Sequence, residues 1–229
     1  MEQASSHPRL AALAAACRSH GFDFLERAEP ALRGLDVYLE LLLKWNKAMN
    51  LVGHAGREEI LEDLVLDSFH LAAFLESLPL PDAPECWDFG AGAGLPGVPL
   101  RLLWQAGDYW LVEAREKRAL FLQNVLAACP LPGTRVWRGR VENFMATAKA
   151  ADLLISRAFM PWPQLLELVS GKLAPGGLVV CLTLEEAPAT LPESLHGNWR
   201  LLCSRQYSPS ALKPDKLRHF WAFEQIQRG

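Results

Sequence analysis

The first third of the chain carries apolar residues at helical spacing. Between residues 31 and 49 they recur every three or four positions, so one face of the predicted helix is hydrophobic. Residues 57–75 repeat this pattern, and residues 8–20, rich in Ala and Leu, predict a further helix that Gly21 ends. We therefore expect an N-terminal helical cap over residues 1–84. It could pack on a sheet or serve as a lid on the substrate side.

From residue 85 to residue 229, short apolar runs alternate with helical patterns. This alternation predicts parallel strands with helices on both faces of the sheet, an α/β fold. The expected strands are residues 86–89, 109–113, 135–138, 153–156 and 178–182. The expected helices are residues 97–105, 116–128, 141–148 and 164–173. The last two apolar runs, residues 199–207 and 218–226, have no long helix between them, which predicts a closing hairpin with one antiparallel strand.

The stretch WDFGAGAGLPGVPL, residues 87–100, joins the first expected strand to its helix. Asp88 stands at the end of the strand, and four glycines follow it: Gly90, Gly92, Gly94 and Gly97. Glycines allow a tight turn and let a ligand approach the backbone, and the last three match the G-x-G-x-x-G pattern. Glu113 ends the next strand, where such folds place an acid against a ribose hydroxyl. The pattern predicts a nucleoside-containing cofactor at the carboxyl edge of the sheet.

Asp88 helps to choose among the cofactors. A dinucleotide would place its pyrophosphate over the turn, where a carboxylate repels it. S-adenosylmethionine carries an ammonium, a sulfonium and a ribose, which suit an acid at each of the first two strand ends. The residues thus favour a methyltransferase over a nicotinamide-dependent dehydrogenase. A glycine-rich turn that binds nothing is the remaining alternative.

Composition limits the class of protein further. The 229 residues are 50% hydrophobic, enough for a substantial core, and the net charge of −3 excludes a bulk nucleic-acid-binding surface. No long apolar run or signal peptide is visible, so we expect a cytoplasmic protein with no membrane contact. The five cysteines are scattered and the histidines lack metal-ligand spacing, so we expect buried thiols and no metal.

Several short motifs give a more specific signal. They are Trp45-Asn46-Lys47, Leu66-Asp67-Ser68, Leu95-Pro96-Gly97-Val98-Pro99-Leu100, Ser156-Arg157-Ala158-Phe159, Pro175-Gly176-Gly177 and Arg218-His219. With them the chain, from about Tyr38 onward, resembles the bacterial guanine-N7 methyltransferases of small-subunit ribosomal RNA, the family of glucose-inhibited division protein B. The resemblance implies a class I, Rossmann-like methyltransferase fold with a seven-stranded, mostly parallel sheet. It also implies S-adenosyl-L-methionine as donor and a guanine in the decoding-region hairpin of 16S rRNA as acceptor. We expect 16S rRNA or the 30S ribosomal subunit as the partner, and a monomeric protein.

Pattern and resemblance together predict the site residues. The expected cofactor-binding residues are Asp88, Gly90, Gly92, Gly94, Leu95, Glu113, Val141, Glu142 and Arg157. The expected RNA-binding residues are Lys117, Arg118, Arg218 and His219. Arg157, at the end of the fourth strand, is the catalytic candidate and could hold guanine O6 or a phosphate, unless it pairs with Asp67 instead. Glu142 could read the adenine amino group or simply favour a helix N-terminus. Trp162 could stack a base or belong to the core.

Guanine N7 has a free lone pair and no proton to lose. Methyl transfer to it needs alignment and control of charge, and no general base. A sequence without a catalytic triad therefore agrees with this chemistry.

The chain departs from the family at two places. Asp63-Leu64 stands where members usually have Arg-His, and Thr183-Leu184 where they usually have Lys-Gly. Both departures remove positive charge that would lie near RNA. Two alternatives thus stay open: a methyltransferase of this fold acting on another RNA or a small molecule, and a non-catalytic ribosome-assembly module that keeps the cofactor site.

Overall fold

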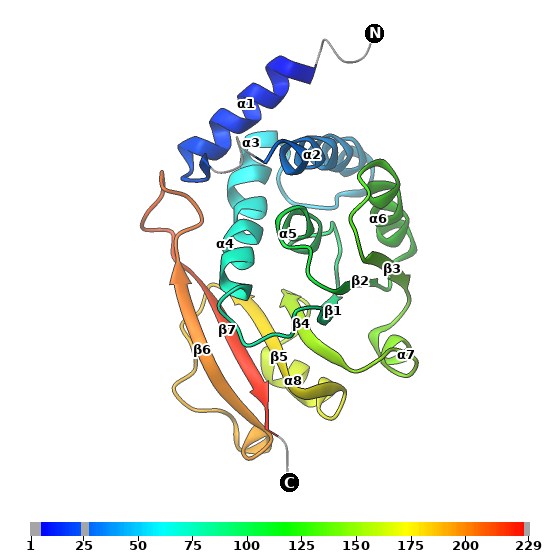
Figure 1. Ribbon diagram of the computed structural model, residues 1–229, viewed down its shortest axis with the longest axis vertical. Coiled ribbons are helices and arrows are strands. Elements are labelled where there is room, and N and C mark those ends of the chain that lie inside the picture. Colours follow the sequence, from blue (N-terminus) through cyan, green and yellow to red (C-terminus); the bar gives the residue numbers. More distant parts are fainter. Residues whose placement is uncertain (1–5, 24–27, 227–229) are drawn as a thin grey trace.

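A seven-stranded sheet organises the chain (Figure 1). The computed structural model describes residues 6–23 and 28–226. The strand order is β3-β2-β1-β4-β5-β7-β6, and β7 is antiparallel to both of its neighbours while β1 to β5 are parallel. The strands are β1 (Glu85–Phe89), β2 (Asp108–Glu113), β3 (Thr134–Arg138), β4 (Ala151–Arg157), β5 (Leu173–Thr183), β6 (Trp199–Tyr207) and β7 (Arg218–Gln225). The predicted α/β sheet and its closing antiparallel hairpin are confirmed.

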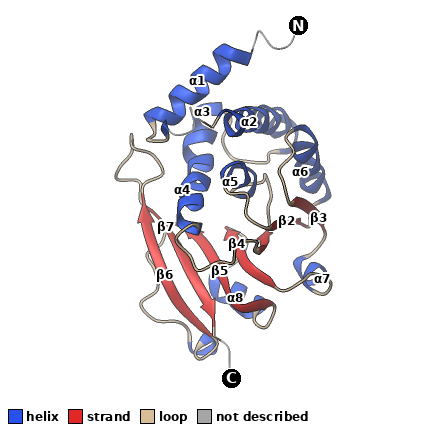
Figure 2. Ribbon diagram, in the orientation of Figure 1, coloured by secondary structure: helices blue, strands red, loops and turns tan. Residues whose placement is uncertain are grey.

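Helices cover both faces of the sheet (Figure 2). In the N-terminal part they are α1 (Ser6–Ser19), α2 (Glu29–Met49), α3 (Arg57–Ile60), the π-helical η2 (Leu61–Val65) and α4 (Leu66–Leu75). Between and after the strands they are α5 (Gly97–Leu103), α6 (Glu116–Ala128), α7 (Val141–Met145), α8 (Trp162–Val169) and the short 3₁₀ helix η3 (Glu193–Leu195). Helices α4, α5 and α6 lie on one face of the sheet, with α2 over α5 and α6, and α7 and α8 lie on the other (Figure 1).

Alternating side chains of each strand supply two hydrophobic cores. In β1, Cys86 packs with the N-terminal helices, α5 and α6, whereas Trp87 and Phe89 pack with α7 and α8. This is the period of two that a strand buried on both faces requires. The cap shares the first core with the sheet, since Leu35 of α2 and Phe74 of α4 are buried in the same cluster as Cys86. The proposed division of the chain at residues 84 and 85 falls where β1 begins.

The segment predicted as one helix over residues 57–75 has three parts, α3, η2 and α4. A single π turn adds one residue to a helix and leaves apolar residues three or four positions apart on either side of it. The sequence pattern therefore does not reveal the π turn at Leu61–Val65. The turn keeps Leu61 and Val65 in the core, while Glu62 and Asp63 pair with lysines of the loop after β6. Strand β5 also begins earlier than predicted, at Leu173.

No described helix has the length and apolar character needed to cross a lipid bilayer. The five cysteines are free thiols, four of them buried and Cys203 partly so. Among residues 6–23 and 28–226, no group of three His, Cys, Asp or Glu side chains is arranged to hold a metal ion.

Candidate active site

The glycine loop leaves β1 at the carboxyl edge of the sheet and turns into α5. Gly90 has φ +70°, and a Cβ at this position would lie 2.6 Å from the ring of Phe159. Gly94 has φ +81°, and a Cβ there would lie 2.6 Å from Val98. Both positions therefore require glycine for conformation and for space. The hydroxyl of Tyr38 in α2 donates a hydrogen bond of 2.8 Å to the Ala93 carbonyl, so the cap supports the loop from behind.

Glu113 is held against this loop from the end of β2. Its Oε2 accepts a hydrogen bond of 2.9 Å from the Gly92 amide, and its Oε1 accepts one of 2.7 Å from the Arg115 amide. The residue is only 5% exposed. Each carboxylate oxygen has a second lone pair, so the group can still accept hydrogen bonds from a ligand.

A pocket of about 460 Å³ opens beside Glu113. Gly90, Val141 and Glu142 line it, as do Arg118, Arg140 and Phe159. Four of the predicted cofactor residues, Glu113 among them, thus surround one space of the size that small ligands use. Gly92 contributes through its bond to Glu113, while Gly94 and Leu95 are not part of the lining.

Asp88 lies beneath the loop and outside this pocket. The residue is 1% exposed, and its Oδ2 accepts a hydrogen bond of 3.2 Å from the Tyr109 hydroxyl. Burial raises the pKa of Asp88 to about 7, against the weaker opposing effects of the Tyr109 hydroxyl and the Gly97 amide. A direct bond from Asp88 to a cofactor ammonium would require the loop to move.

The Asp88→Asn variant is expected to gain stability over wild type as the pH rises. Because folding raises the pKa of Asp88, the unfolded chain loses this proton at a lower pH than the folded protein does. The stabilisation from the protonated carboxyl is therefore complete below the ordinary pKa of 3.8 and is lost as the pH rises to about 7. Asn does not titrate, so the Asp88→Asn variant does not lose this stability. The free energy of unfolding of the variant minus that of wild type should therefore rise by about 1–3 kcal/mol between pH 5 and pH 8. Urea unfolding at both pH values measures the difference. A difference that does not change with pH would contradict the assignment.

A second pocket, of about 600 Å³, adjoins the first. The two share one residue, Ala158, which has φ +53° in the tight turn after β4. The left-handed conformation is strained for a residue with a Cβ and occurs often at functional sites. Around the second pocket stand side chains of both charges and one imidazole. The acids are Asp63, Asp67 and Glu185, the cations are Arg157, Lys216 and Arg218, and the imidazole is that of His54.

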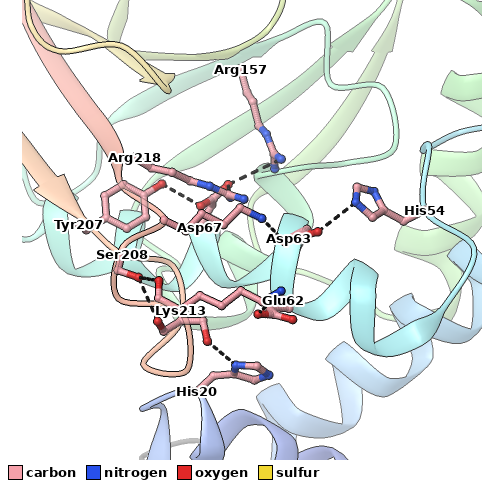
Figure 3. Close-up of polar contacts among 12 residues, drawn as sticks. His20, His54, Glu62, Asp63, Asp67, Arg157, Tyr207, Ser208, Lys213 and Arg218 are labelled. Atoms are coloured by element: carbon pink, nitrogen blue, oxygen red, sulfur yellow. Dashed lines mark hydrogen bonds and ion pairs between the residues drawn. The ribbon is translucent and has the colours of Figure 1, made fainter.

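Asp67 connects three elements at the wall of the second pocket (Figure 3). Its Oδ1 accepts a hydrogen bond of 2.8 Å from the Tyr207 hydroxyl, and its Oδ2 pairs with Arg218 and lies 3.6 Å from Nη2 of Arg157. Arg157 also donates from Nη1 to the Leu64 carbonyl at 3.0 Å. The pair with Asp67, the alternative considered for Arg157, is therefore present, and it holds the guanidinium at the edge of the second pocket. The contact of Arg157 with guanine O6 or a phosphate stays a prediction.

The predicted RNA residues occupy different environments. Lys117 is exposed at the start of α6, and Arg118 lines the first pocket. Arg218 and His219 are each 7% exposed, and only Arg218 lines the second pocket. Trp162 stacks on Phe223 with ring centroids 5.2 Å apart, within the core on the α8 side, so the alternative of a core residue holds.

Sequence reasoning missed several residues that shape the site. Tyr38 and Tyr207 occur within apolar patterns, which gave no sign of their hydroxyl partners. Asp63 and Lys216 are about 150 positions apart in the sequence, so no local pattern could predict that they pair. A tyrosine on an otherwise aliphatic helix face was the single available sign of a buried hydroxyl with a partner.

The seven-stranded sheet with helices on both faces and a closing antiparallel hairpin is the fold of class I methyltransferases. Solved structures of low sequence identity share the architecture. A putative methyltransferase from Escherichia coli (yhhF) aligns with TM-score 0.52 and 17% identity over 70% of this chain and 86% of that chain. A putative methylase from Haemophilus influenzae aligns with TM-score 0.50 and 21% identity over 71% of this chain and 91% of that chain.

The chain belongs to the rRNA small subunit methyltransferase G family (GidB), whose model matches residues 31–193. Ribosomal RNA small subunit methyltransferase G of Nitratidesulfovibrio vulgaris is 52% identical over 92% of this chain and 91% of its own length. The protein of the same name from Lawsonia intracellularis is 48% identical over 84% of this chain and 86% of its own length. The resemblance seen in the motifs is thereby confirmed.

Proposed function

We propose that this protein transfers a methyl group from S-adenosylmethionine to N7 of a guanine in 16S rRNA of the small ribosomal subunit. The observation that carries the proposal is the pair of pockets that meet at Ala158, in a chain of this family. The first pocket offers the buried Glu113 and the glycine loop, and the second offers Arg157 at the end of β4. Methyl donor and acceptor base would thus approach each other at the carboxyl edge of the sheet, where open α/β folds bind their ligands.

The first pocket fits the cofactor. When bound, S-adenosylmethionine supplies a methyl group activated by its positively charged sulfur. Glu113 is expected to accept hydrogen bonds from the ribose hydroxyls, since its carboxylate is already oriented by the Gly92 and Arg115 amides. Gly90, Val141 and Glu142 also line this pocket, and Val141 and Glu142 are expected to hold the adenine.

The second pocket fits the acceptor nucleotide. Its volume of about 600 Å³ lies within the range of small-molecule sites. Arg157 is expected to donate to guanine O6 or to a phosphate, leaving N7 free to attack. Because N7 has no proton, the residues around the pocket need to align the base and balance its developing positive charge, and no base has to accept a proton.

Transfer of labelled methyl from S-adenosylmethionine to 16S rRNA tests the proposal. The substrates are naked 16S rRNA and 30S subunits from a strain that lacks the endogenous enzyme, and the product is digested to identify the modified base. Labelled 7-methylguanine supports the proposal. Cofactor binding without any transfer would favour the non-catalytic assembly module, and label in another base or another RNA would overturn the acceptor.

Glu113→Gln is expected to weaken cofactor binding about 10- to 100-fold, as for the loss of one charge-assisted hydrogen-bonding group. The amide presents one acceptor oxygen and a donor group, which cannot serve both the Gly92 amide and a ribose. Calorimetric titration with S-adenosylmethionine measures the change.

Glu142→Gln provides the comparison, because Glu142 lines the same pocket but is exposed. A loss at Glu142 equal to that at Glu113 would favour a role in reading adenine. An unchanged affinity would leave Glu142 as a charge at the start of α7. An unchanged affinity in Glu113→Gln would contradict the assigned ribose contact.

A further inference from the structure

The loop between β6 and β7, residues 208–217, is tied to the π turn η2 by ion pairs (Figure 3). Nζ of Lys213 lies 2.8 Å from Oε1 of Glu62, and Lys216 pairs with Oδ1 of Asp63. The other oxygen of Asp63 lies 3.1 Å from Nε2 of His54. Two adjacent acids of the cap thus hold two lysines of the C-terminal hairpin.

Other contacts hold the body of this loop. A hydrogen bond of 2.7 Å joins Nδ1 of His20 to the hydroxyl of Ser210, which is 1% exposed. The Ser208 hydroxyl lies 2.9 Å from the Ser210 carbonyl and 2.7 Å from the Lys213 carbonyl, and its one proton is shared between them. The backbone of the loop is therefore fixed by bonds that do not use the ammonium groups, so the lysine side chains can change partners while the loop stays in place.

One of these ion pairs, that of Asp63 with Lys216, borders the second pocket. Asp63 and Lys216 line it together with Arg157. The side chains of Lys213 and Lys216 are 50% and 38% exposed, so water and salt screen their attraction to the acids. RNA phosphates bind lysines with release of counterions, which favours the exchange most at low salt.

We propose that Glu62 and Asp63 occupy the positions of RNA phosphates in the free protein, and that Lys213 and Lys216 exchange these carboxylates for phosphates of the nucleotides flanking the acceptor base. The inference rests on the proposed function for its class of partner, RNA. The β6–β7 loop is then an RNA-binding surface whose positive charge is neutralised until RNA arrives. The acids lower affinity for any polyanion that cannot reach both lysines.

This exchange predicts the sign of a mutational effect. Asp63→Asn and Glu62→Gln keep the size of the side chain and remove its charge, which frees the lysine beside it. RNA binding should become tighter, about 3- to 10-fold for each variant, as expected for one phosphate contact no longer in competition. Acids that served only to hold the loop in place would have the opposite effect, since their removal would weaken binding.

Asp215→Asn is the matched control. Asp215 lies in the same loop and is exposed, and within the described residues it forms no ion pair with a lysine. Its substitution changes the net charge by the same amount, so it measures the general loss of repulsion. The variants Asp63→Asn and Glu62→Gln must exceed this control for the proposal to stand.

Binding of a 16S rRNA transcript is measured at several salt concentrations. The proteins compared are wild type, Asp63→Asn, Glu62→Gln, Asp215→Asn, Lys216→Met, and the double variant Lys216→Met with Asp63→Asn. Lys216→Met should cost more affinity in the Asp63→Asn background than in wild type, and should there reduce the salt slope by about 1. Thermal unfolding of each variant shows that it is folded. If Asp63→Asn fails to fold, Glu62→Gln with Lys213→Met carries the same test.

The outcomes separate this inference from the proposed function. The exchange is overturned if Asp63→Asn and Glu62→Gln change RNA affinity no more than Asp215→Asn does, or if both weaken binding. In that case wild type still binds and methylates the RNA, so the proposed function stands. Absence of wild-type binding to 16S rRNA under all conditions overturns the proposed function and the exchange together.

Discussion

Replacing Arg101 by Met is expected to lower the free energy of unfolding by about 3–5 kcal/mol, because several buried carbonyls would lose their donor at roughly 1–3 kcal/mol for each one left unsatisfied. Arg101 lies in α5 and is fully buried. Its guanidinium donates to five backbone carbonyls and to the Thr134 hydroxyl; the carbonyls are those of Trp104, Gln105, Ala106, Gly107 and Pro132. Two connections at the amino edge of the sheet are thus joined through one side chain.

Methionine fills similar space but leaves these carbonyls without their donor. The connection after α5 and the connection before β3 would then lose the side chain that hydrogen-bonds to both of them. Burial lowers the pKa of Arg101, yet a guanidinium stays charged near neutral pH. The loss should therefore be nearly the same from pH 6 to pH 8.

Urea unfolding of Arg101→Met against wild type measures this effect. Arg101→Lys is the informative companion, because it keeps the charge but has three donors on one nitrogen, too few for the planar set of bonds. It should fall between wild type and Met. A loss below about 1 kcal/mol in the Met variant would show that water replaces the missing donors.

The contrast between Arg101 and Glu113 shows what sequence can predict about this molecule. Glu113 follows an apolar run at the spacing of a known cofactor pattern, so its place at the loop could be expected from its neighbours in the chain. Arg101 occurs in a short helix and looks like an exposed cation, because its partners are carbonyls that no residue type encodes. The same holds for Tyr38, whose partner is the carbonyl of Ala93.

Charge pairs between distant segments were also hidden. Sequence patterns placed Arg157 at a strand end and named Asp67 as its alternative partner, but Tyr207 and Arg218 join the same carboxylate from strands more than 130 positions away. The loss of positive charge at Asp63 looked like a defect in an RNA surface. In the fold, Lys216 lies against that residue, so charge is supplied there from the other end of the chain.

Arg157→Ala is expected to reduce kcat/KM for methyl transfer about 10²- to 10³-fold, the range for loss of one preorganised donor near developing charge. Arg157 is the last residue of β4 and directly precedes Ala158, the residue that lines both pockets. Its guanidinium is fixed by the Leu64 carbonyl and by Asp67, so it meets the substrate without reorganising. Cofactor affinity, measured by calorimetry, should change far less than transfer.

Two comparisons separate this role from a structural one. Arg157→Lys keeps the charge and loses the planar pair of donors, so it should recover only part of the activity. Arg135→Ala removes an exposed arginine, paired with Asp108 at the opposite edge of the sheet, and should leave kcat/KM within about twofold, as for most surface substitutions. Since Arg157 supports Leu64 in η2, thermal unfolding accompanies each assay. Full activity in a folded Arg157→Ala protein would exclude the guanidinium from the acceptor site and shift the search to Arg218, which shares Asp67 with it.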